Sequence, residues 1–543
     1  MKIASSRRKI VARAGSAATA GAFRRARGIM LALLMPAVLS GAGLPDVARA
    51  EEASKSAASM EARVTGLIPD LESYIRSGMK AYDLPGLAIG IVTGERLVYA
   101  KGFGVRSKAG GAPVDPRTVF QIGSLAKAFL ATTMAIMVDR GKLKWDDRVV
   151  DLYPAFQLKD AWVTREFRAF DVIAQRSGLP PYANDFVGML GYEEPALIRS
   201  LRHVEPVSSF RTTFAYTNVT HTLAGRIVSN LAGAPDWNAV ARRELLDPLG
   251  MAETSFTAEA IEAAANHASG HRWTLHGTIE VPIEPIFPYS FGPAGDINST
   301  IEDMARWTRL QLRNGSFEGR RIVSPDSLAY TRIPKVAVED RVSYAMGWMV
   351  SQTPNGSIVF HNGDTLGFGV FLGLLPDRDV GVIVLSNQGN VGLPDGIGMW
   401  ALDRLLDNPV VDHVADTLKL VKSKFAALEK SFAKPANPRP FPPLAPLAGS
   451  LGSPVFGKAA LRTEGDTLVL ELQETGAQIA LAPWDGDVFT FRVLPRGRFA
   501  PMVATNMGPR LSGFAQLESG QDGKLGVLHL TLGDGQAYEF RRE

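Results

Sequence analysis

The sequence predicts an α+β fold, in which an antiparallel sheet carries a helical insertion and a small all-β domain follows. Strand-like segments lie at 87–104 and 357–387, and residues 150–330 between them are mostly helical or loop-like in pattern. Residues 447–543 contain short apolar strands separated by Gly and Asp turns. Strands at both ends of a segment with helices between them are typical of a sheet with a helical insertion.

Residues 1–50 have the build of a signal peptide. They carry nine Lys or Arg residues against one acid, an apolar stretch from Ile29 to Leu39, and the small-x-small sequence Ala48-Arg49-Ala50. A membrane span takes about 20 apolar residues, and this stretch is shorter and interrupted by Pro36. We therefore expect cleavage, export to the periplasm or the extracellular space, and no stable membrane anchor afterwards.

The composition argues against several classes of protein. The formal net charge is +4, and removing the net +8 of residues 1–50 (nine minus one) leaves −4, so we expect no nucleic-acid partner. The chain has no cysteine, which excludes disulfides, a thiol nucleophile and a thiolate metal site. The sequence leaves the oligomeric state open.

The predicted domains follow one another along the chain. Residues 51–415 form the main domain, 416–446 form a helix and a proline-rich linker, and 447–543 form a small β-barrel or sandwich. The elements expected in the main domain are a hairpin at 87–104, a helix from Ser124 to about Arg140, a helix opened by the capping box Ser299-x-x-Glu302, and strands at 357–363, 369–376 and 380–387.

Ser124-Leu-Ala-Lys127 places a hydroxyl and an amine three residues apart at the start of a predicted helix. The two side chains then lie on one helical turn, and the helix N-terminus favours the negative charge that develops during acyl transfer. Lys127 can activate the hydroxyl only as a neutral amine, which burial promotes. This pattern predicts Ser124 as a nucleophile.

The Ser-x-x-Lys pattern is weak by itself, because Ser6-x-x-Lys9 and Ser431-x-x-Lys434 also match it. Only Ser124 follows a strand-like segment and opens a long apolar helix. The structural alternative is a helix-capping serine with a solvated lysine.

Tyr216-Thr-Asn218 precedes an apolar-faced helix and places a phenol and an amide on the same side of an extended stretch. The phenol can carry the proton from Ser124 to the leaving group, and the amide can hold Lys127 and a substrate amide. A competing match, Tyr182-Ala-Asn184, lies in a Pro/Gly-rich loop. We favour Tyr216.

His361-Asn-Gly363 lies at the end of a predicted strand. We expect His361 to offer a donor to a substrate carboxylate or to Tyr216, and Gly363 to leave room for a substrate along the strand edge. The backbone N–H of Asp364, paired with that of Ser124, would form an oxyanion hole.

The order of these motifs resembles that of the penicillin-recognising serine hydrolases, which include class C β-lactamases, D-aminopeptidases, DD-carboxypeptidases and related esterases. The resemblance covers about residues 60–410 and extends to the phrases FQIGSLAK, GPAGDINSTIEDMARW and VGVIVLSN. The tail beyond the proline linker is similar to the lipocalin-like β-barrel found behind some peptidase members.

The resemblance implies a catalytic role for each matching position. Ser124 would be the nucleophile, Lys127 and Tyr216 would share base and acid duties, Asn218 would support them, and His361 would occupy the third motif. The β-lactamases proper carry Lys-Thr-Gly there, whereas His-x-Gly is more like the D-aminopeptidases and allied peptidases.

The expected activity is therefore that of a peptidase or amidase on small or unusual peptides, including those with D residues. A carboxylesterase and a weak β-lactamase are the next alternatives within the family. Rivals from other classes are a cell-wall peptide-binding protein without catalysis and a metal hydrolase built on His267, His271 and His276, which lack a suitably placed carboxylate. We expect no metal and no cofactor.

Overall fold

The computed structural model describes residues 45–389, 391–504, 512–520, 524–533 and 535–543. Residues Ser54–Glu543 form one compact unit. The predicted signal peptide lies outside the described residues, except that residues 45–50 begin helix α1 (Pro45–Tyr82). Among the described residues, we find no helix with the length and apolar character that crossing a bilayer requires.

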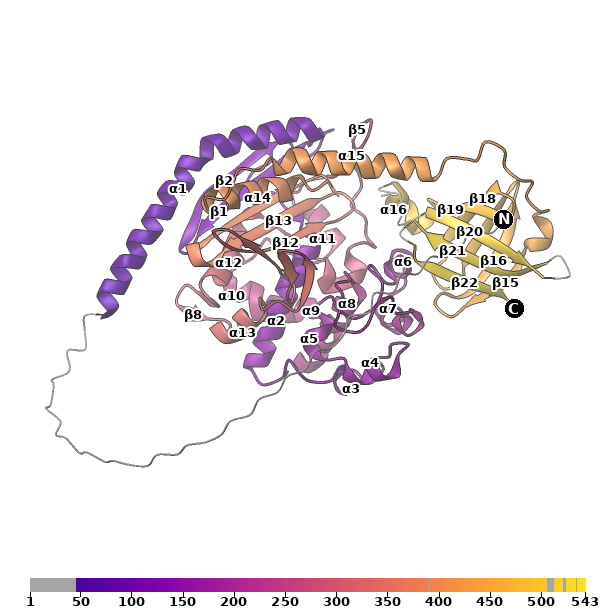
Figure 1. Cartoon of the computed structure of the whole chain (residues 1–543), viewed down its shortest axis with the longest axis horizontal. Helices are drawn as coiled ribbons and strands as arrows, with labels where there is room; N and C mark the ends of the chain where they lie inside the picture. Colours follow the sequence, from indigo (N-terminus) through magenta and orange to yellow (C-terminus); the bar gives the residue numbers. More distant parts are fainter. Residues whose placement is uncertain (1–44, 390, 505–511, 521–523, 534) are drawn as a thin grey trace, which may run out of the picture. The chain divides into compact units, whose positions relative to one another are not determined.

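The main sheet is antiparallel and has eight strands in the order β2-β1-β14-β13-β12-β11-β10-β9 (Figure 1). Strand β1 belongs to the first hairpin in the chain, and it pairs with β14, the last strand of this sheet in chain order. The fold class and the strands expected at 87–104 and 357–387 are thereby confirmed. The strands are β1 (Gly86–Thr93), β2 (Arg96–Gly104), β9 (Val336–Glu339), β10 (Val342–Tyr344), β11 (Met349–Thr353), β12 (Gly356–Asp364), β13 (Gly369–Leu375) and β14 (Val380–Ser386).

Helices cover both faces of this sheet because its strands are apolar on both sides. Every residue of β1 is buried, and its side chains alternate between two core clusters. Leu87 and Ile89 pack in the cluster with α1, α14 (Leu393–Leu405) and α15 (His413–Ser431). Ala88 and Val92 pack in the cluster with α2 (Ala126–Asp139) and α12 (Ile301–Leu312).

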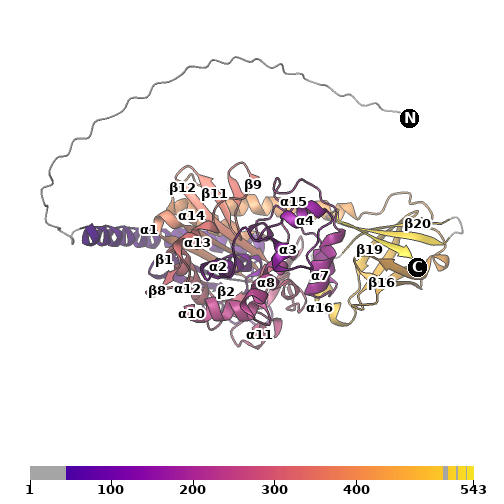
Figure 2. The same cartoon turned by 90° about the horizontal axis from the view of Figure 1, so that it is seen from below.

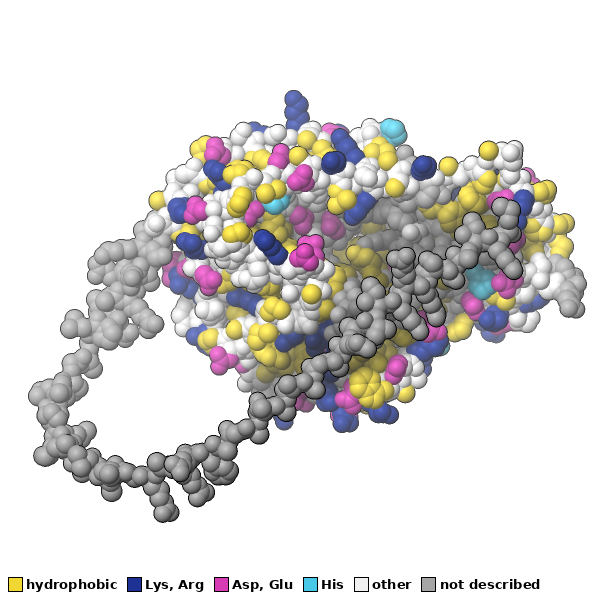
Figure 3. All heavy atoms as spheres, viewed as in Figure 1, with side chains coloured by type: hydrophobic (Ala, Val, Ile, Leu, Met, Phe, Trp, Pro, Cys, Tyr) yellow, Lys and Arg dark blue, Asp and Glu magenta, His cyan; other side chains and the backbone are white. Residues whose placement is uncertain are grey.

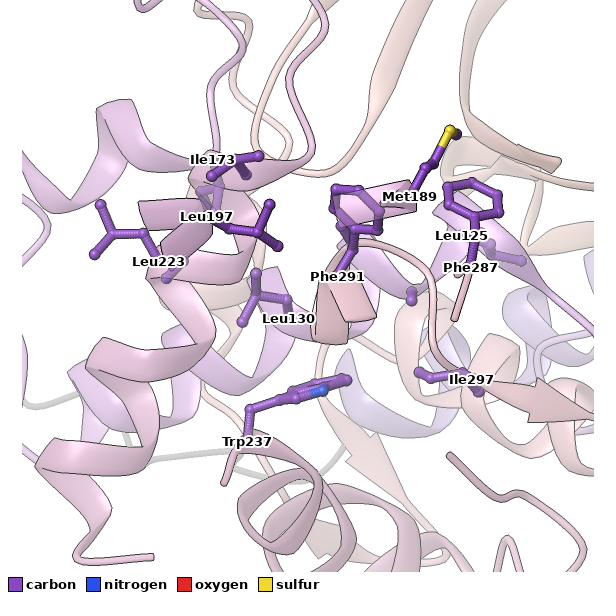
Figure 4. Packing of buried hydrophobic residues seen from close by; sticks show 14 of the residues in the cluster. Leu125, Leu130, Ile173, Met189, Leu197, Leu223, Trp237, Phe287, Phe291 and Ile297 are labelled. Carbon is purple, nitrogen blue, oxygen red and sulfur yellow. The ribbon is translucent and has the colours of Figure 1, made fainter. Parts of the chain in front are cut away.

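The helical insertion lies between β2 and β9, and Figure 2 shows its helices α3, α4, α7 and α8 near one another. Figure 4 shows side chains from α2, α8 and the segment 287–297 in one apolar cluster. The remaining helices and short strands here are α3 (Val149–Leu152), α4 (Ala161–Glu166), α5 (Ala169–Val172), α6 (Asp185–Met189), α7 (Glu194–Ser200), α8 (Val219–Ala232), α9 (Trp237–Ala241), α10 (Asp247–Leu249), α11 (Ala258–Ala263), α13 (Pro325–Tyr330), β3 (Phe120–Gln121), β4 (Gly270–Thr274), β5 (Gly277–Val281), β6 (Asn298–Ser299), β7 (Ser316–Phe317) and β8 (Arg320–Arg321).

The capping prediction for α12 was wrong by one residue. Thr300 is the N-cap, and its hydroxyl accepts the N–H of Asp303 at 3.1 Å. Ser299 instead belongs to the short strand β6, where it pairs with Phe120. Capping depends on where the extended backbone ends, and the pairing with β3 extends it past Ser299.

The C-terminal region is a closed eight-stranded barrel. Of the two folds that the sequence left open for this region, the structure shows the barrel and not the sandwich. Each strand pairs with the next, and the last pairs with the first through Leu451 and Arg542. This up-and-down order is that of lipocalin-type barrels. The strands are β15 (Gly449–Ser453), β16 (Gly457–Glu464), β17 (Thr467–Leu472), β18 (Gln478–Asp485), β19 (Val488–Val493), β20 (Ser512–Ser519), β21 (Leu525–Leu532) and β22 (Ala537–Arg542), with the short helix α16 (Ala500–Ala504) between β19 and β20.

The described surface carries charges of both signs. On the face drawn in Figure 3, Lys and Arg side chains are interspersed with Asp and Glu side chains. That face therefore presents no extended area of a single charge sign among its described residues.

Candidate active site

Ser124 lies in a 3₁₀ turn, Gly123–Leu125, that runs directly into α2. Gly123 has a φ of 50°, in the left-handed region that favours glycine, and a Cβ there would come 2.9 Å from the carbonyl oxygen of Asp364. The turn and the end of β12 therefore pack backbone against backbone. This contact holds Ser124 beside the end of β12, an interior strand of the main sheet.

Lys127 is fully buried beside Ser124. Its Nζ lies 3.0 Å from Ser124 Oγ, 2.7 Å from Asn218 Oδ1 and 2.7 Å from the carbonyl oxygen of Ala294. An ammonium can donate to all three oxygens, and a neutral amine can donate to two of them and accept the Ser124 proton. The same geometry therefore suits both states of a base that takes up and returns one proton.

Tyr216 contacts the same pair from another side. Burial raises the pKa of Tyr216 well above its usual value, and a hydrogen bond with Ser124 opposes this shift. The phenol is thus protonated at neutral pH. Lys127 Nζ lies 4.7 Å from the centroid of the Tyr216 ring, so Ser124, Lys127 and Tyr216 meet at one point.

Asn218 is the N-cap of α8, and its side-chain amide connects two charged residues. Its Oδ1 accepts from Lys127, and its Nδ2 donates to Asp185 Oδ2 at 2.6 Å. Asp185 is 4% exposed. Sequence reasoning missed Asp185, although it directly follows the competing Tyr182-x-Asn184 match.

His361 is fully buried on β12 but does not line the pocket at Ser124. Its Nε2 lies 3.2 Å from the hydroxyl of Tyr344, and its ring centroid lies 6.3 Å from that of Tyr216. Burial, with a smaller effect from the charge of Lys127, lowers the pKa of His361 to about 3. The ring is neutral near pH 7 and packs beside the rings of Tyr216 and Tyr344. Donation from His361 to a substrate carboxylate or to Tyr216 stays a prediction.

Gly363 and Asp364 lie where β12 crosses the Ser124 turn. A Cβ on Gly363 would come 2.0 Å from the carbonyl oxygen of Ile122 and 3.0 Å from the backbone nitrogen of Ser124. Any larger residue at 363 would therefore push these segments apart. The structure brings together the two segments whose N–H groups were expected to form the oxyanion hole, and the hole itself stays a prediction.

A pocket of about 260 Å³ opens at Ser124. Among its described lining residues there is no Lys, Arg or His, and aromatic rings form much of the wall. The lining residues are Ser124, Tyr182, Phe214, Tyr216, Asn218, Phe287, Pro288, Phe291, Ala294, Gly295, Met349, Asn362, Gly363 and Asp364. The pocket therefore suits an apolar or aromatic group of a substrate.

Asn362 and Asp395 form a second polar pair that the sequence analysis missed. Asn362 lines the pocket, and its Nδ2 donates to Asp395 Oδ1 at 2.8 Å. Burial, followed by the charge of Asp364, raises the pKa of Asp395 to about 7. Asn362 was visible in the sequence as the middle residue of His361-x-Gly363, but Asp395 lies on α14 and only the fold brings it near.

Two of the three histidines of the rival metal hypothesis are bonded to the backbone through a ring nitrogen. His267 Nδ1 lies 2.6 Å from the carbonyl oxygen of Ala264, and His271 Nδ1 lies 2.9 Å from that of Asn387. His276 is exposed in the turn between β4 and β5. In the part of the chain that the structure describes, no three His, Cys, Asp or Glu side chains gather in a metal-binding arrangement.

The main domain matches the protein-family model described as Beta-lactamase over residues 71–406, which is more than half of the chain. The chain therefore belongs to the beta-lactamase family of serine hydrolases. Penicillin-binding protein 4 of Amycolatopsis lactamdurans is 28% identical to it over 383 residues, covering 68% of this chain and 93% of that protein.

Two further similarities span more of the chain. An unguisins hydrolase of Aspergillus violaceofuscus is 25% identical over 478 residues, covering 79% of this chain and 83% of that protein. The octameric penicillin-binding protein homologue from Pyrococcus abyssi superimposes with a TM-score of 0.57 and 22% identity, covering 87% of this chain and 99% of that one. The second similarity concerns the fold alone.

Proposed function

We propose that this protein is a peptidase or amidase that forms an acyl-enzyme on Ser124 and acts on small or unusual peptides, including peptides with D residues. The observation that carries the proposal is the convergence of Lys127 Nζ, 3.0 Å from Ser124 Oγ, and Tyr216 on one hydroxyl beside an open pocket. A hydroxyl needs such a base to become a nucleophile.

The proposed reaction moves one proton in each half. Ser124 Oγ attacks the substrate carbonyl while its proton passes to Lys127. As the C–N bond breaks, Tyr216 donates its proton to the departing amine and regains one from Lys127, so that the net transfer is one proton from Ser124 to the amine. The backbone N–H groups of Ser124 and Asp364 hold the oxyanion. A water molecule then attacks the acyl group, and its proton returns through the same residues as Ser124 leaves.

The pocket supports an amide or peptide substrate over a β-lactam. A β-lactam carries a carboxylate, and a cationic side chain is the usual partner for such a group. No Lys, Arg or His is among the described residues that line the pocket, and the neutral ring of His361 faces Tyr344. An aromatic wall without a cationic side chain favours a substrate with an uncharged apolar group. Esters rank second, because acyl transfer from an ester needs the same residues.

Hydrolysis is also favoured over binding without catalysis. Similarity to proteins named unguisins hydrolases supports a catalytic chain. We also propose export to the periplasm or the extracellular space, which the composition of residues 1–50 supports. The N-terminal sequence of protein recovered outside the cytoplasm would test this, with a start at residue 51 expected.

Intact-mass measurement after exposure to a fluorophosphonate tests the nucleophile. We expect one adduct on the wild type, one on Ser431→Ala as a control at another Ser-x-x-Lys copy, and none on Ser124→Ala. No adduct on the wild type, or an adduct that persists in Ser124→Ala, would contradict the proposal.

A hydrolysis panel tests the substrate class. It would contain D- and L-amino-acid amides, linear peptides, short-chain esters and a chromogenic cephalosporin. We expect the highest kcat/KM on an amide or peptide with an apolar side chain. A higher kcat/KM on the cephalosporin would reverse the assignment.

A further inference from the structure

The loop of residues 181–192 contacts both halves of the Tyr216-x-Asn218 motif. The backbone N–H of Tyr182 donates to the carbonyl oxygen of Tyr216 at 2.6 Å, and the two rings lie 5.7 Å apart. Asp185 accepts from Asn218, as described above. This 181–192 loop therefore supplies both a wall of the pocket and the partner that orients Asn218.

The backbone of the 181–192 loop is strained. Tyr182 and Asn184 have φ values of 57° and 59°, in the left-handed region that residues other than glycine rarely adopt. This conformation is unfavourable for a residue with a side chain, so it persists only where surrounding contacts hold it. The contacts on the far side of the loop come from the barrel.

One end of the barrel meets the 181–192 loop. In an antiparallel meander, the turns from β15 to β16 and from β21 to β22 emerge at the same end. Gln536, in the β21–β22 turn, donates through Nε2 to the carbonyl oxygens of Pro181 at 3.3 Å and Tyr182 at 3.1 Å. Its Oε1 accepts the backbone N–H of Asn184 at 3.1 Å. A single side chain thus bonds the backbone at both left-handed residues.

Aromatic packing reinforces these hydrogen bonds. The ring of Phe186, which is 2% exposed, lies 6.2 Å from those of Phe456 and Phe491 and 5.9 Å from that of Tyr538. The hydroxyl of Tyr192 donates to the carbonyl oxygen of Phe456 at 2.6 Å. Removal of the Gln536 contacts should therefore loosen the loop while the apolar contact keeps the barrel in place.

We propose that the barrel is a working part of the active site and that Gln536 is a positioning residue acting through the 181–192 loop. This inference rests on the function proposed above. A carboxylate only accepts hydrogen bonds, so Asp185 makes Asn218 present its Nδ2 to Asp185 and its Oδ1 to Lys127. A loosened loop would free that amide to rotate and would move Tyr182 in the pocket wall.

The first test compares Gln536→Ala with Gln516→Ala in the full chain. Gln516 is an exposed glutamine of β20 that bonds Asp487 within the barrel, so its variant is a matched control. We expect Gln536→Ala to slow labelling of Ser124 by a fluorophosphonate about 10- to 100-fold, the cost of a misplaced catalytic group. Gln516→Ala should stay within about twofold of the wild type, as distant surface changes do. Equal rates for the two variants would overturn the inference.

A double-mutant cycle separates positioning from general destabilisation. Gln536→Ala and Asp185→Asn should act through the same loop, so their effects on the labelling rate should be less than multiplicative. Effects that multiply would mean that Gln536 does not reach Ser124 through Asp185, and would overturn the inference.

Hydrogen exchange of the 181–192 loop tests the contact without any catalysis. We expect faster exchange there in Gln536→Ala than in Gln516→Ala, because the Asn184 N–H loses its acceptor. Unchanged exchange would overturn the inference even if the wild type is labelled. Faster exchange in a chain whose wild type takes no label would support the contact and defeat the proposed function instead.

A second variant covers the case in which Gln536→Ala fails to fold. Gln536→Glu keeps an acceptor for Asn184 and loses the two donated hydrogen bonds. It should slow labelling by an intermediate factor, and a rate equal to that of Gln516→Ala would overturn the inference.

Discussion

The Tyr216-x-Asn218 and Tyr182-x-Asn184 segments carry the same residue types at the same spacing, and both reach the active-site pocket. Tyr216 and Asn218 bond the Ser124–Lys127 pair. Tyr182 lines the pocket, whereas the Asn184 side chain donates to Ser200 at 2.7 Å and its backbone bonds Gln536. The difference comes from the backbone. Both asparagines are helix N-caps, but Asn218 has a right-handed backbone conformation and Asn184 a left-handed one, so their side chains leave the chain in different directions.

The comparison has meaning only if Ser124 and Lys127 act as a unit. Ser124→Ala and Lys127→Ala should each lower kcat/KM by several orders of magnitude. The double variant should lower it little more than either single variant, because catalytic residues that act as a unit lose about the same factor, about 10⁶-fold in one hydrolase, whether one or all are removed. Steady-state kinetics on an amide substrate would measure this. Losses that multiply would separate the two residues.

The two tyrosines should differ next. Tyr216→Phe removes the phenol that contacts Ser124 and should lower kcat about 10²- to 10⁴-fold, the usual range for a proton-transferring group. Tyr182→Phe keeps the ring in the pocket wall and should act mainly on KM, by a factor of about 2 to 5 for one lost polar contact. Comparison of kcat and KM for the two variants checks this. A larger fall in kcat for Tyr182→Phe would exchange their roles.

The two asparagines should show a smaller contrast. Asn218→Ala leaves buried Lys127 and Asp185 without a shared partner and should lower kcat about 10- to 100-fold, consistent with 1–3 kcal/mol per buried group. Asn184→Ala loses the Ser200 bond and should cost about 1 kcal/mol of unfolding free energy with a lesser effect on kcat. Urea unfolding and kinetics on both variants measure the two quantities. A greater loss of kcat in Asn184→Ala would refute the distinction.

The smallest expected effect concerns the stability of the fold in acid, through a histidine on the helix that follows Tyr216-x-Asn218. His221 on α8 is fully buried, and burial lowers its pKa well below the usual value. The unfolded chain then binds a proton that the folded chain does not, so stability should fall as the pH drops below about 6.5, by at most about 1.4 kcal/mol per pH unit. His361 contributes with the same sign.

Urea unfolding at pH 7.5 and 5.5 would check this acid dependence. His221→Gln should reduce the difference in unfolding free energy between the two pH values. His276→Gln, at an exposed histidine, should leave that difference as it is in the wild type. A pH dependence unchanged by His221→Gln would show that another group is responsible.

Local patterns predicted much of the fold, because strands and helices follow from short-range alternation and turn residues. The hairpin at 87–104 and the strands expected at 357–363, 369–376 and 380–387 appear within one residue of their expected bounds. The cap at Thr300 was missed by one residue because pairing with β3 decides where the extended backbone ends. Closure of the barrel was also outside the reach of local pattern, since it depends on β15 meeting β22.

The sequence by itself determined the Ser124–Lys127 pair, because a spacing of three on a helix fixes which side chains share a turn. Only the tertiary structure decided what completes that pair. Asp185, the carbonyl of Ala294 and Gln536 come from segments far apart in the chain, and their contacts exist only once the sheet and barrel have formed. The tertiary structure also decided the orientation of the His361 ring, because that orientation depends on its buried neighbours Tyr344 and Tyr216.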